Sequence, residues 1–140
     1  MPMEPGRRTL AALMQRLLFV CLGGAFGTGA RYLVAGWAQK ALGAGFPYGT
    51  FTVNLLGSFL LGLLMVVSVS TESISPTLRI ALTTGAMGGF TTYSTFSYET
   101  MRYAQEGAYG MAALNIGLTV TVCLVASFAG VAVGRLLVAS

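Results

Sequence analysis

The stretch GAMGGFTTYSTFSYE, residues 85–99, decides the fold of this chain. It lies inside a segment long enough to cross a membrane, but three of its first five residues are glycine. Glycine costs about 1 kcal/mol relative to alanine inside a helix, and the hydroxyl side chains that follow compete for backbone hydrogen bonds. In hydrocarbon every backbone polar group needs a partner, so an interrupted helix is stable only against protein or a polar cavity. We therefore predict a broken transmembrane helix lined by hydroxyls and aromatic rings, as in ion sites.

The composition around this stretch is that of an integral membrane protein. Of the 140 residues, 55% are hydrophobic and only 9% are charged, whereas soluble domains carry about a quarter charged residues. A span needs roughly 20 apolar residues, so the chain has room for four helices and short loops. The sequence predicts an all-α, multi-pass protein of the cell membrane, with residues 1–140 forming one four-helix transmembrane domain.

The order of apolar runs and turn residues places these four spans. We expect them at about 17–38, 48–69, 78–102 and 108–138. Glycine and proline at Gly43, Gly45 and Pro47 mark the first loop, and residues 70–77 form the second. Residues 1–15 are interpreted as a short, frayed, cationic tail at the membrane surface.

Small residues and the charge balance bear on how helices pair. Gly23 with Gly27, and Gly130 with Gly134, have the GxxxG spacing that lets another helix approach closely. Alternating spans would put five cationic side chains on the side of the first residue and two or three on the other, which gives only a weak orientation signal. A chain that inserts both ways could form an antiparallel, dual-topology homodimer, and such a dimer would bury the glycine faces.

Polar residues inside the spans leave two interpretations open. Arg31 either reaches the lipid headgroups or acts as a buried structural or anion-attracting charge. Asn54 serves either to bind helices together or to line a pore as a donor. On the last span a stripe at four-residue steps either forms interhelical hydrogen bonds or provides a track for a partly hydrated solute; it consists of Asn115, Thr119, Cys123 and Ser127.

Several kinds of chemistry are absent. There is no His and no Asp, and both cysteines lie in apolar runs, so neither a zinc-type site nor a catalytic triad can be assembled. No GxxxxGK[ST] loop exists, so no nucleotide is expected. The net charge of +4 is assigned to loops and lipid headgroups rather than to nucleic acid. The protein is not expected to be an enzyme.

What remains is a pore or carrier lined by hydroxyls, amides and aromatic rings. A dehydrated small anion needs short hydrogen bonds from N–H and O–H groups, and ring edges carry partial positive charge. Tyr93 and Phe96 are three residues apart and therefore share a helix face. Such a pair can also be ordinary packing, but here it follows a predicted break and is interleaved with hydroxyls.

These residues resemble the Fluc (CrcB) fluoride channels. The resemblance covers the first three spans in order, and the fourth by its polar stripe and its Gly130, Gly134 ending. It rests on the segments Gly23-Gly24-Ala25-Phe26-Gly27 to Arg31-Tyr32, Gly49-Thr50 to Asn54, Gly57-Ser58-Phe59 to Gly62, and Gly85 to Phe96.

The resemblance implies antiparallel homodimers with two fluoride pores, in which the broken third helices cross at the centre. It also implies a structural sodium ion on backbone carbonyls, at positions that match Gly88 and Thr91. The implied pore residues are Asn54, Tyr93, Phe96, Ser94, Thr95, Asn115, Thr119 and Arg31. The chain departs from the family pattern at Tyr93, where a phenol replaces the first phenylalanine and adds a hydroxyl.

The resemblance thus leads us to expect a passive, fluoride-selective channel that exports fluoride and lowers its toxicity. Its expected partners are fluoride, membrane lipid and a second copy of the chain. One alternative is a small multidrug-type four-helix exporter, but that class needs a Glu in its first span, and this chain has none there. The other is a membrane assembly subunit that transports nothing.

Overall fold

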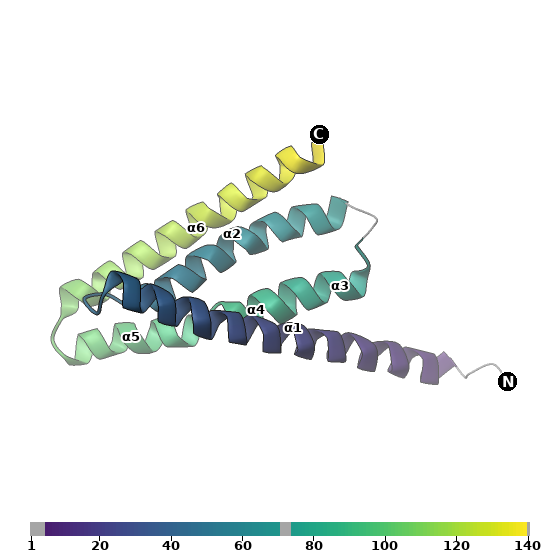
Figure 1. The fold of residues 1–140 in the computed structure, drawn as a ribbon, viewed down its shortest axis with the longest axis horizontal. Helices are drawn as coiled ribbons and strands as arrows, with labels where there is room; N and C mark the ends of the chain where they lie inside the picture. Colours follow the sequence, from purple (N-terminus) through teal and green to yellow (C-terminus); the bar gives the residue numbers. More distant parts are fainter. Residues whose placement is uncertain (1–4, 71–73, 140) are drawn as a thin grey trace.

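The computed structural model describes residues 5–70 and 74–139, which form helices and turns without any strand. Three helices are long and apolar enough to cross a membrane: α1 (Pro5–Leu42), α2 (Tyr48–Ser70) and α6 (Tyr109–Ala139). In the sequence the third span comes between α2 and α6, and it is divided into short helices (Figure 1). They are α3 (Pro76–Ile80), the π-helical segment η1 (Ala81–Met87), α4 (Gly88–Phe90) and α5 (Tyr93–Gln105).

The break in the third span lies at Thr91 and Thr92. Their backbones are extended, with φ/ψ of −85°/162° and −150°/102°. The prediction of a broken third helix is confirmed. Of its two predicted causes, the glycines are not where the break lies, because Gly85, Gly88 and Gly89 all remain helical, whereas the hydroxyl residues are. The hydroxyl pair interrupts the helix, and partners from other helices stabilise the extended backbone.

Glycines of the third span instead permit close packing on α1. A Cβ added at Gly85 would lie 2.7 Å from the Val20 carbonyl oxygen, and one at Gly89 would lie 2.5 Å from that of Gly24. A methyl group does not fit at either distance. The backbones of α1 and the third span therefore touch directly, which fixes how the break is presented.

The GxxxG glycines are also used within the chain. Gly23 and Gly27 on α1 face the carbonyls of Ala81 and Ala86 on η1. Gly130 on α6 faces the Phe59 carbonyl on α2, and α2 and α6 form the most extensive helix pair. The expectation that a dimer buries these glycine faces is wrong, because helices of the same chain already cover them.

The connection from α1 to α2 is fixed by one amide side chain. Gly43 has a φ of +93°, which favours glycine, and it ends α1. The Gln39 amide nitrogen donates to the Phe46 carbonyl over 3.1 Å, and its oxygen accepts from the Gly49 N–H over 3.1 Å. That N–H belongs to the first turn of α2, where helical partners are lacking, so Gln39 supplies the missing acceptor.

At the opposite end, α3 begins with a serine cap and a proline. Ser75 Oγ accepts from the Leu78 N–H over 3.2 Å, and Pro76 follows at the first helical position. The Arg79 guanidinium donates to the Ser68 carbonyl in the last turn of α2, which joins the two helices. Of the expected second loop, Ser70 and residues 76–77 are helical, and residues 71–73, including Glu72, lie outside the described part.

The expected tail is a helix where the structure describes it. α1 begins at Pro5, so the interpretation of residues 5–15 as frayed is wrong, and residues 1–4 lie outside the described part. Residues 5–16 are rich in leucine, alanine, arginine and methionine, all good helix formers, and they continue the helix that begins the first span.

Candidate functional site

The break is held from α2 by Asn54. The Thr92 N–H donates to Asn54 Oδ1 over 2.7 Å, and Asn54 Nδ2 donates back to the Thr92 carbonyl over 3.1 Å. Both backbone groups of Thr92 are thereby satisfied at a buried position. An unpaired buried group costs about 1–3 kcal/mol. Asn54 therefore joins α2 to the third span, which is the binding role that its spacing suggested.

The break is held from α1 by Arg31. Its guanidinium donates to the Thr91 carbonyl over 3.3 Å, sixty residues away in the sequence. Arg31 is half-buried. Of the two interpretations that the sequence left open, the structure supports a buried structural charge directed at the break.

The helix restarts at a threonine cap. Thr92 Oγ1 accepts from the Thr95 N–H over 3.3 Å and donates to the Thr95 hydroxyl oxygen over 2.8 Å. The Ser94 hydroxyl oxygen lies 3.5 Å from Thr92 Oγ1. Thr92 is buried, whereas Ser94 and Thr95 are exposed on the surface of the chain. The first turn of α5 therefore presents two hydroxyls outward beside a capped helix start.

A groove of about 400 Å³ runs along the break between α2 and α6. No charged side chain lines it among the described residues. A few amide, hydroxyl and thiol groups occur in its wall among aliphatic and aromatic groups. Its lining consists of Asn54, Gly57, Ser58, Leu61, Thr91, Tyr93, Phe96, Thr119, Val120, Cys123, Leu124 and Ser127.

The two aromatic rings of the third span both line this groove. Their centroids are 5.7 Å apart, and their planes are tilted by 52°. Phe96 is 7% exposed and Tyr93 is 79% exposed. The shared face predicted from their spacing is thus present, but one ring packs into the chain and the other stands at its surface.

The polar stripe of α6 faces the interior of the bundle near the N-terminal end of the helix. Asn115, only 1% exposed, donates to the Thr100 hydroxyl over 2.9 Å and so connects α6 to α5. The Thr119 hydroxyl donates to Asn115 Oδ1 over 3.3 Å. The N-terminal part of the stripe, at Asn115, therefore bonds to another helix. The part from Thr119 onward lines the groove. The interhelical bonding predicted from the sequence is confirmed for Asn115, and the track for a solute stays a prediction for the part that lines the groove.

The sequence analysis missed Thr50 and Glu99 as a pair. The Thr50 hydroxyl donates to Glu99 Oε1 over 2.8 Å, and Glu99 Oε2 is buried without a hydrogen-bond partner in the described structure. Thr50 lies four residues before Asn54 and Glu99 three after Phe96, so each shares a helix face with a residue already singled out. That spacing is the signal that could have identified them.

Only oxygen atoms at the break suit a metal ion. Within residues 5–70 and 74–139 no three His, Cys, Asp or Glu side chains are grouped for metal binding. The break leaves the Gly88 carbonyl without its helical donor, because the Thr92 N–H bonds to Asn54 instead. The Thr91 carbonyl accepts from Arg31 and retains a second lone pair. These hard oxygen donors fit a cation such as sodium, and one chain supplies two of them.

Comparison with known proteins gives consistent matches. A family model described as "CrcB-like protein, Camphor Resistance (CrcB)" matches residues 18–131. A relative from Sorangium cellulosum is 49% identical over 126 residues, which cover 90% of this chain and 99% of the relative. One from Anaeromyxobacter sp. (strain K) is 53% identical over 116 residues, covering 83% of this chain and 92% of the relative. A Geotalea daltonii relative is 46% identical over 122 residues, with 87% and 98% covered.

All three relatives bear the name "Fluoride-specific ion channel FluC". The matched region includes all or part of every helix of the bundle and all of the groove-lining residues. Together with the apolar helices, these matches make the chain a multi-pass membrane protein. The chain belongs to the CrcB family.

Proposed function

We propose that this chain forms a passive, fluoride-selective channel that exports fluoride across the cell membrane. The observation that carries the proposal is the uncharged, largely apolar groove at the helix break with a few amide and hydroxyl groups in its wall, in a chain whose relatives are named fluoride channels. No enzymatic activity is proposed. A small multidrug-type exporter is not favoured, because α1 contains no acidic residue from Pro5 to Leu42.

The groove offers donors that can replace the water shell of a small anion. The amide of Asn54 has two N–H groups, and the bond to Thr92 uses one of them. Thr95 is not part of the groove lining but lies in the first turn of α5 beside it; its hydroxyl accepts from Thr92, so its own hydrogen can donate. The edges of the Phe96 and Tyr93 rings add weak positive contacts. Ser94 and Asn115 are further polar groups on the proposed path, as is Thr119, whose hydroxyl hydrogen is used on Asn115, and Arg31 lies beside the break.

Export needs no pump. Neutral hydrogen fluoride crosses lipid, ionises at the higher internal pH and leaves an anion that lipid does not pass. A membrane potential that is negative inside contributes about 2.3 kcal/mol per charge per 100 mV toward efflux. A selective pore therefore suffices to lower fluoride toxicity.

We propose further that the working unit is an antiparallel, dual-topology homodimer. The groove is open along one side of the chain, and Tyr93, Ser94 and Thr95 are exposed at the break. Lipid cannot satisfy these hydroxyls. A second copy would cover them and complete the pore wall. The weak charge asymmetry between the two ends permits both orientations.

In that dimer the carbonyls of Gly88 and Thr91 from both copies would hold a structural sodium ion. Gly88 is exposed, and a Cβ added there would meet no atom within 4 Å, so a second chain has space to approach. The ion would neutralise carbonyls that the break leaves without helical donors. Replacing sodium by N-methylglucamine during reconstitution should lower fluoride efflux and loosen the dimer, as measured by cross-linking.

The central test is fluoride efflux from liposomes containing the purified protein, followed with a fluoride electrode, with chloride efflux as the comparison. We expect fluoride efflux well above chloride efflux. Phe96→Ile should abolish it while the dimer persists, and Asn54→Leu should do the same. Phe128→Ile is the matched control, because Phe128 is 75% exposed on α6 and does not line the groove.

Wild-type efflux in both Phe96→Ile and Asn54→Leu would refute the assignment of the path. Proton-coupled efflux of a cationic dye would instead support the exporter. If deletion of the gene leaves cells no more sensitive to fluoride, the chain would instead be an assembly subunit that transports nothing.

A further inference from the structure

The first helix extends beyond the rest of the bundle. Gly23 on α1 packs against Ala81 of η1, six residues after the Ser75 cap that begins the third span. At 1.5 Å per residue, the level of Ser75 therefore corresponds to about residue 17 of α1. Residues 5–16 project past that level by roughly 18 Å, and no other described helix accompanies them (Figure 1).

This projecting segment, residues 5–16 of α1, is basic. It contains Arg7, Arg8 and Arg16, and no acidic residue occurs anywhere between residues 5 and 71. Arg16 is exposed. The segment lies at the end of the bundle where α2 ends and α3 begins (Figure 1). We therefore expect Arg16 near the level of the lipid headgroups.

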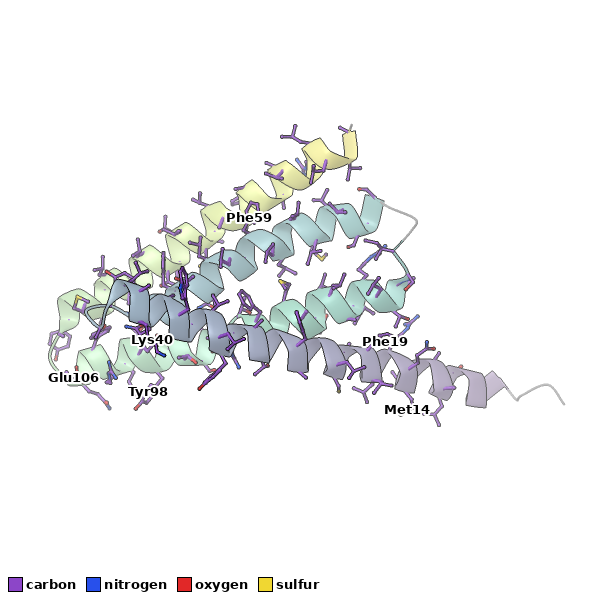
Figure 2. The ribbon with its side chains drawn as sticks, viewed as in Figure 1. Met14, Phe19, Lys40, Phe59, Tyr98 and Glu106 are labelled. Carbon is purple, nitrogen blue, oxygen red and sulfur yellow. The ribbon has the colours of Figure 1, made fainter. Side chains whose placement is uncertain are left out.

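The same segment has an uncovered apolar face. Leu10, Leu13, Met14 and Leu17 follow the i, i+3, i+4, i+7 pattern and are 48–58% exposed. Arg16 lies about 100° around the helix from the middle of this face. Figure 2 shows Met14 on the part of α1 that has no neighbouring helix. An apolar face beside arginines is the pattern of helices that lie at a membrane interface.

The segment precedes the part of the chain that the family model matches. That match begins at residue 18. Residues 5–16 also project past the start of α3, where no other described helix runs beside them (Figure 1). A role separate from the channel path would explain their length and charge.

We propose that the projecting segment binds anionic phospholipid headgroups, with its arginines on the phosphates and its leucine face at the acyl boundary. The choice of ligand rests on charge: the segment itself contains three cations and no acid, Glu4 just before it being the nearest, and each arginine near an anionic surface adds about fivefold to the affinity. In an antiparallel dimer each leaflet would receive one such segment, a consequence that rests on the proposed function.

The test measures lipid preference in the full-length protein. The chain is reconstituted in phosphatidylcholine bilayers, and the association of spin-labelled phosphatidylglycerol is compared with that of spin-labelled phosphatidylcholine. We expect a preference for phosphatidylglycerol that falls about fivefold in Arg16→Gln and further in Arg7→Gln/Arg8→Gln/Arg16→Gln. The matched control is Arg135→Gln, an exposed arginine in the last turns of α6.

Equal losses in Arg16→Gln and Arg135→Gln would overturn the proposal, since general charge would then explain the preference. No preference in the wild type would also overturn it. Dissociation of the dimer by Leu13→Asp would show that a second copy covers the apolar face instead. Fluoride efflux from neutral liposomes should be unchanged in Arg16→Gln, and an inactive wild type would contradict the channel without affecting the lipid result.

Discussion

Asn54 can perform two tasks because an amide carries two N–H groups and an oxygen with two lone pairs. One N–H and the oxygen satisfy the backbone of Thr92, and the other N–H remains for the groove. Its spacing in the sequence suggested binding between helices or lining of a pore as alternatives. The geometry shows that the same side chain joins the helices and lines the groove.

Asn54→Asp separates these tasks. The carboxylate still accepts from the Thr92 N–H, but it removes both donors and adds a negative charge to the groove wall. A like charge 4 Å from the path costs about 4 kcal/mol at an effective dielectric of 20, so fluoride efflux should fall by about two to three orders of magnitude. Efflux from liposomes measures it, and a wild-type rate would contradict the proposed path.

Tyr93→Phe tests the phenol that departs from the family pattern. The structure records no hydrogen bond for the Tyr93 hydroxyl within the described residues, and the ring edge does not depend on it. We expect fluoride efflux within about twofold of the wild type, because each ring keeps its place beside Phe96. An inactive variant would show that fluoride needs the hydroxyl itself.

At the residue scale the sequence identified part of the groove wall but not its internal bonding. Of the eight predicted pore residues, four line the groove (Asn54, Tyr93, Phe96 and Thr119) and the other four do not. The partners of Thr92 and Glu99 could not be found from a single sequence, because Asn54 and Thr50 lie 38 and 49 positions away from them. Only the packing of α2 beside the third span brings these groups together.

At the element scale the third span is interrupted by hydroxyls rather than by glycines. Glycine in water weakens a helix through backbone freedom, but in a close-packed bundle a missing Cβ is also a contact surface. Gly85 and Gly89 are used in the second way. Composition alone could not decide between these effects, because the choice depends on which helix lies alongside.

The threonine cap should contribute to the stability of α5. Thr92→Val removes the hydroxyl that accepts from the Thr95 N–H, so the unfolding free energy should fall by about 1 kcal/mol. Thr92→Ser keeps that acceptor and is the control. Thermal unfolding in detergent compares the two. Equal melting temperatures for the valine and serine variants would show that the cap contributes nothing.

A second prediction for the helices concerns the close contact between α1 and η1. A Cβ at Gly27 would collide with the Ala86 backbone, whereas one at Gly29, on the same helix, would meet no atom within 4 Å. Gly27→Ala should therefore lower the melting temperature or prevent folding, and Gly29→Ala should be neutral or slightly stabilising. Similar effects of the two substitutions would mean that the close approach is not needed.

At the scale of the whole molecule, a single chain provides one wall of a path. Its glycine faces are covered internally, and the exposed groups at the break are the polar ones. The sequence predicted the all-helical fold with a broken third span, but it could not show which faces the chain itself would cover. That distinction arises from helix order and crossing in the folded bundle.

The homodimer predicts a specific cross-link. A cysteine at Ser94, which is exposed at the break, should form a disulfide with its counterpart if two breaks meet at a central crossing. Cys21 and Cys123 are first replaced by alanine to leave no other thiol. The control is a cysteine at Phe128, which is exposed on α6 away from the groove. A cross-link only at the control position would contradict a dimer that meets at the break.

The partners of the break also bear on biogenesis. Arg31 and Asn54 belong to helices that leave the ribosome before the third span, and none of the short helices of that span is by itself long enough to cross a membrane. In a nascent chain α1 and α2 would thus already be packed together in the membrane when the broken third span inserts beside them. Truncations that lack the first two helices should leave the third outside the bilayer.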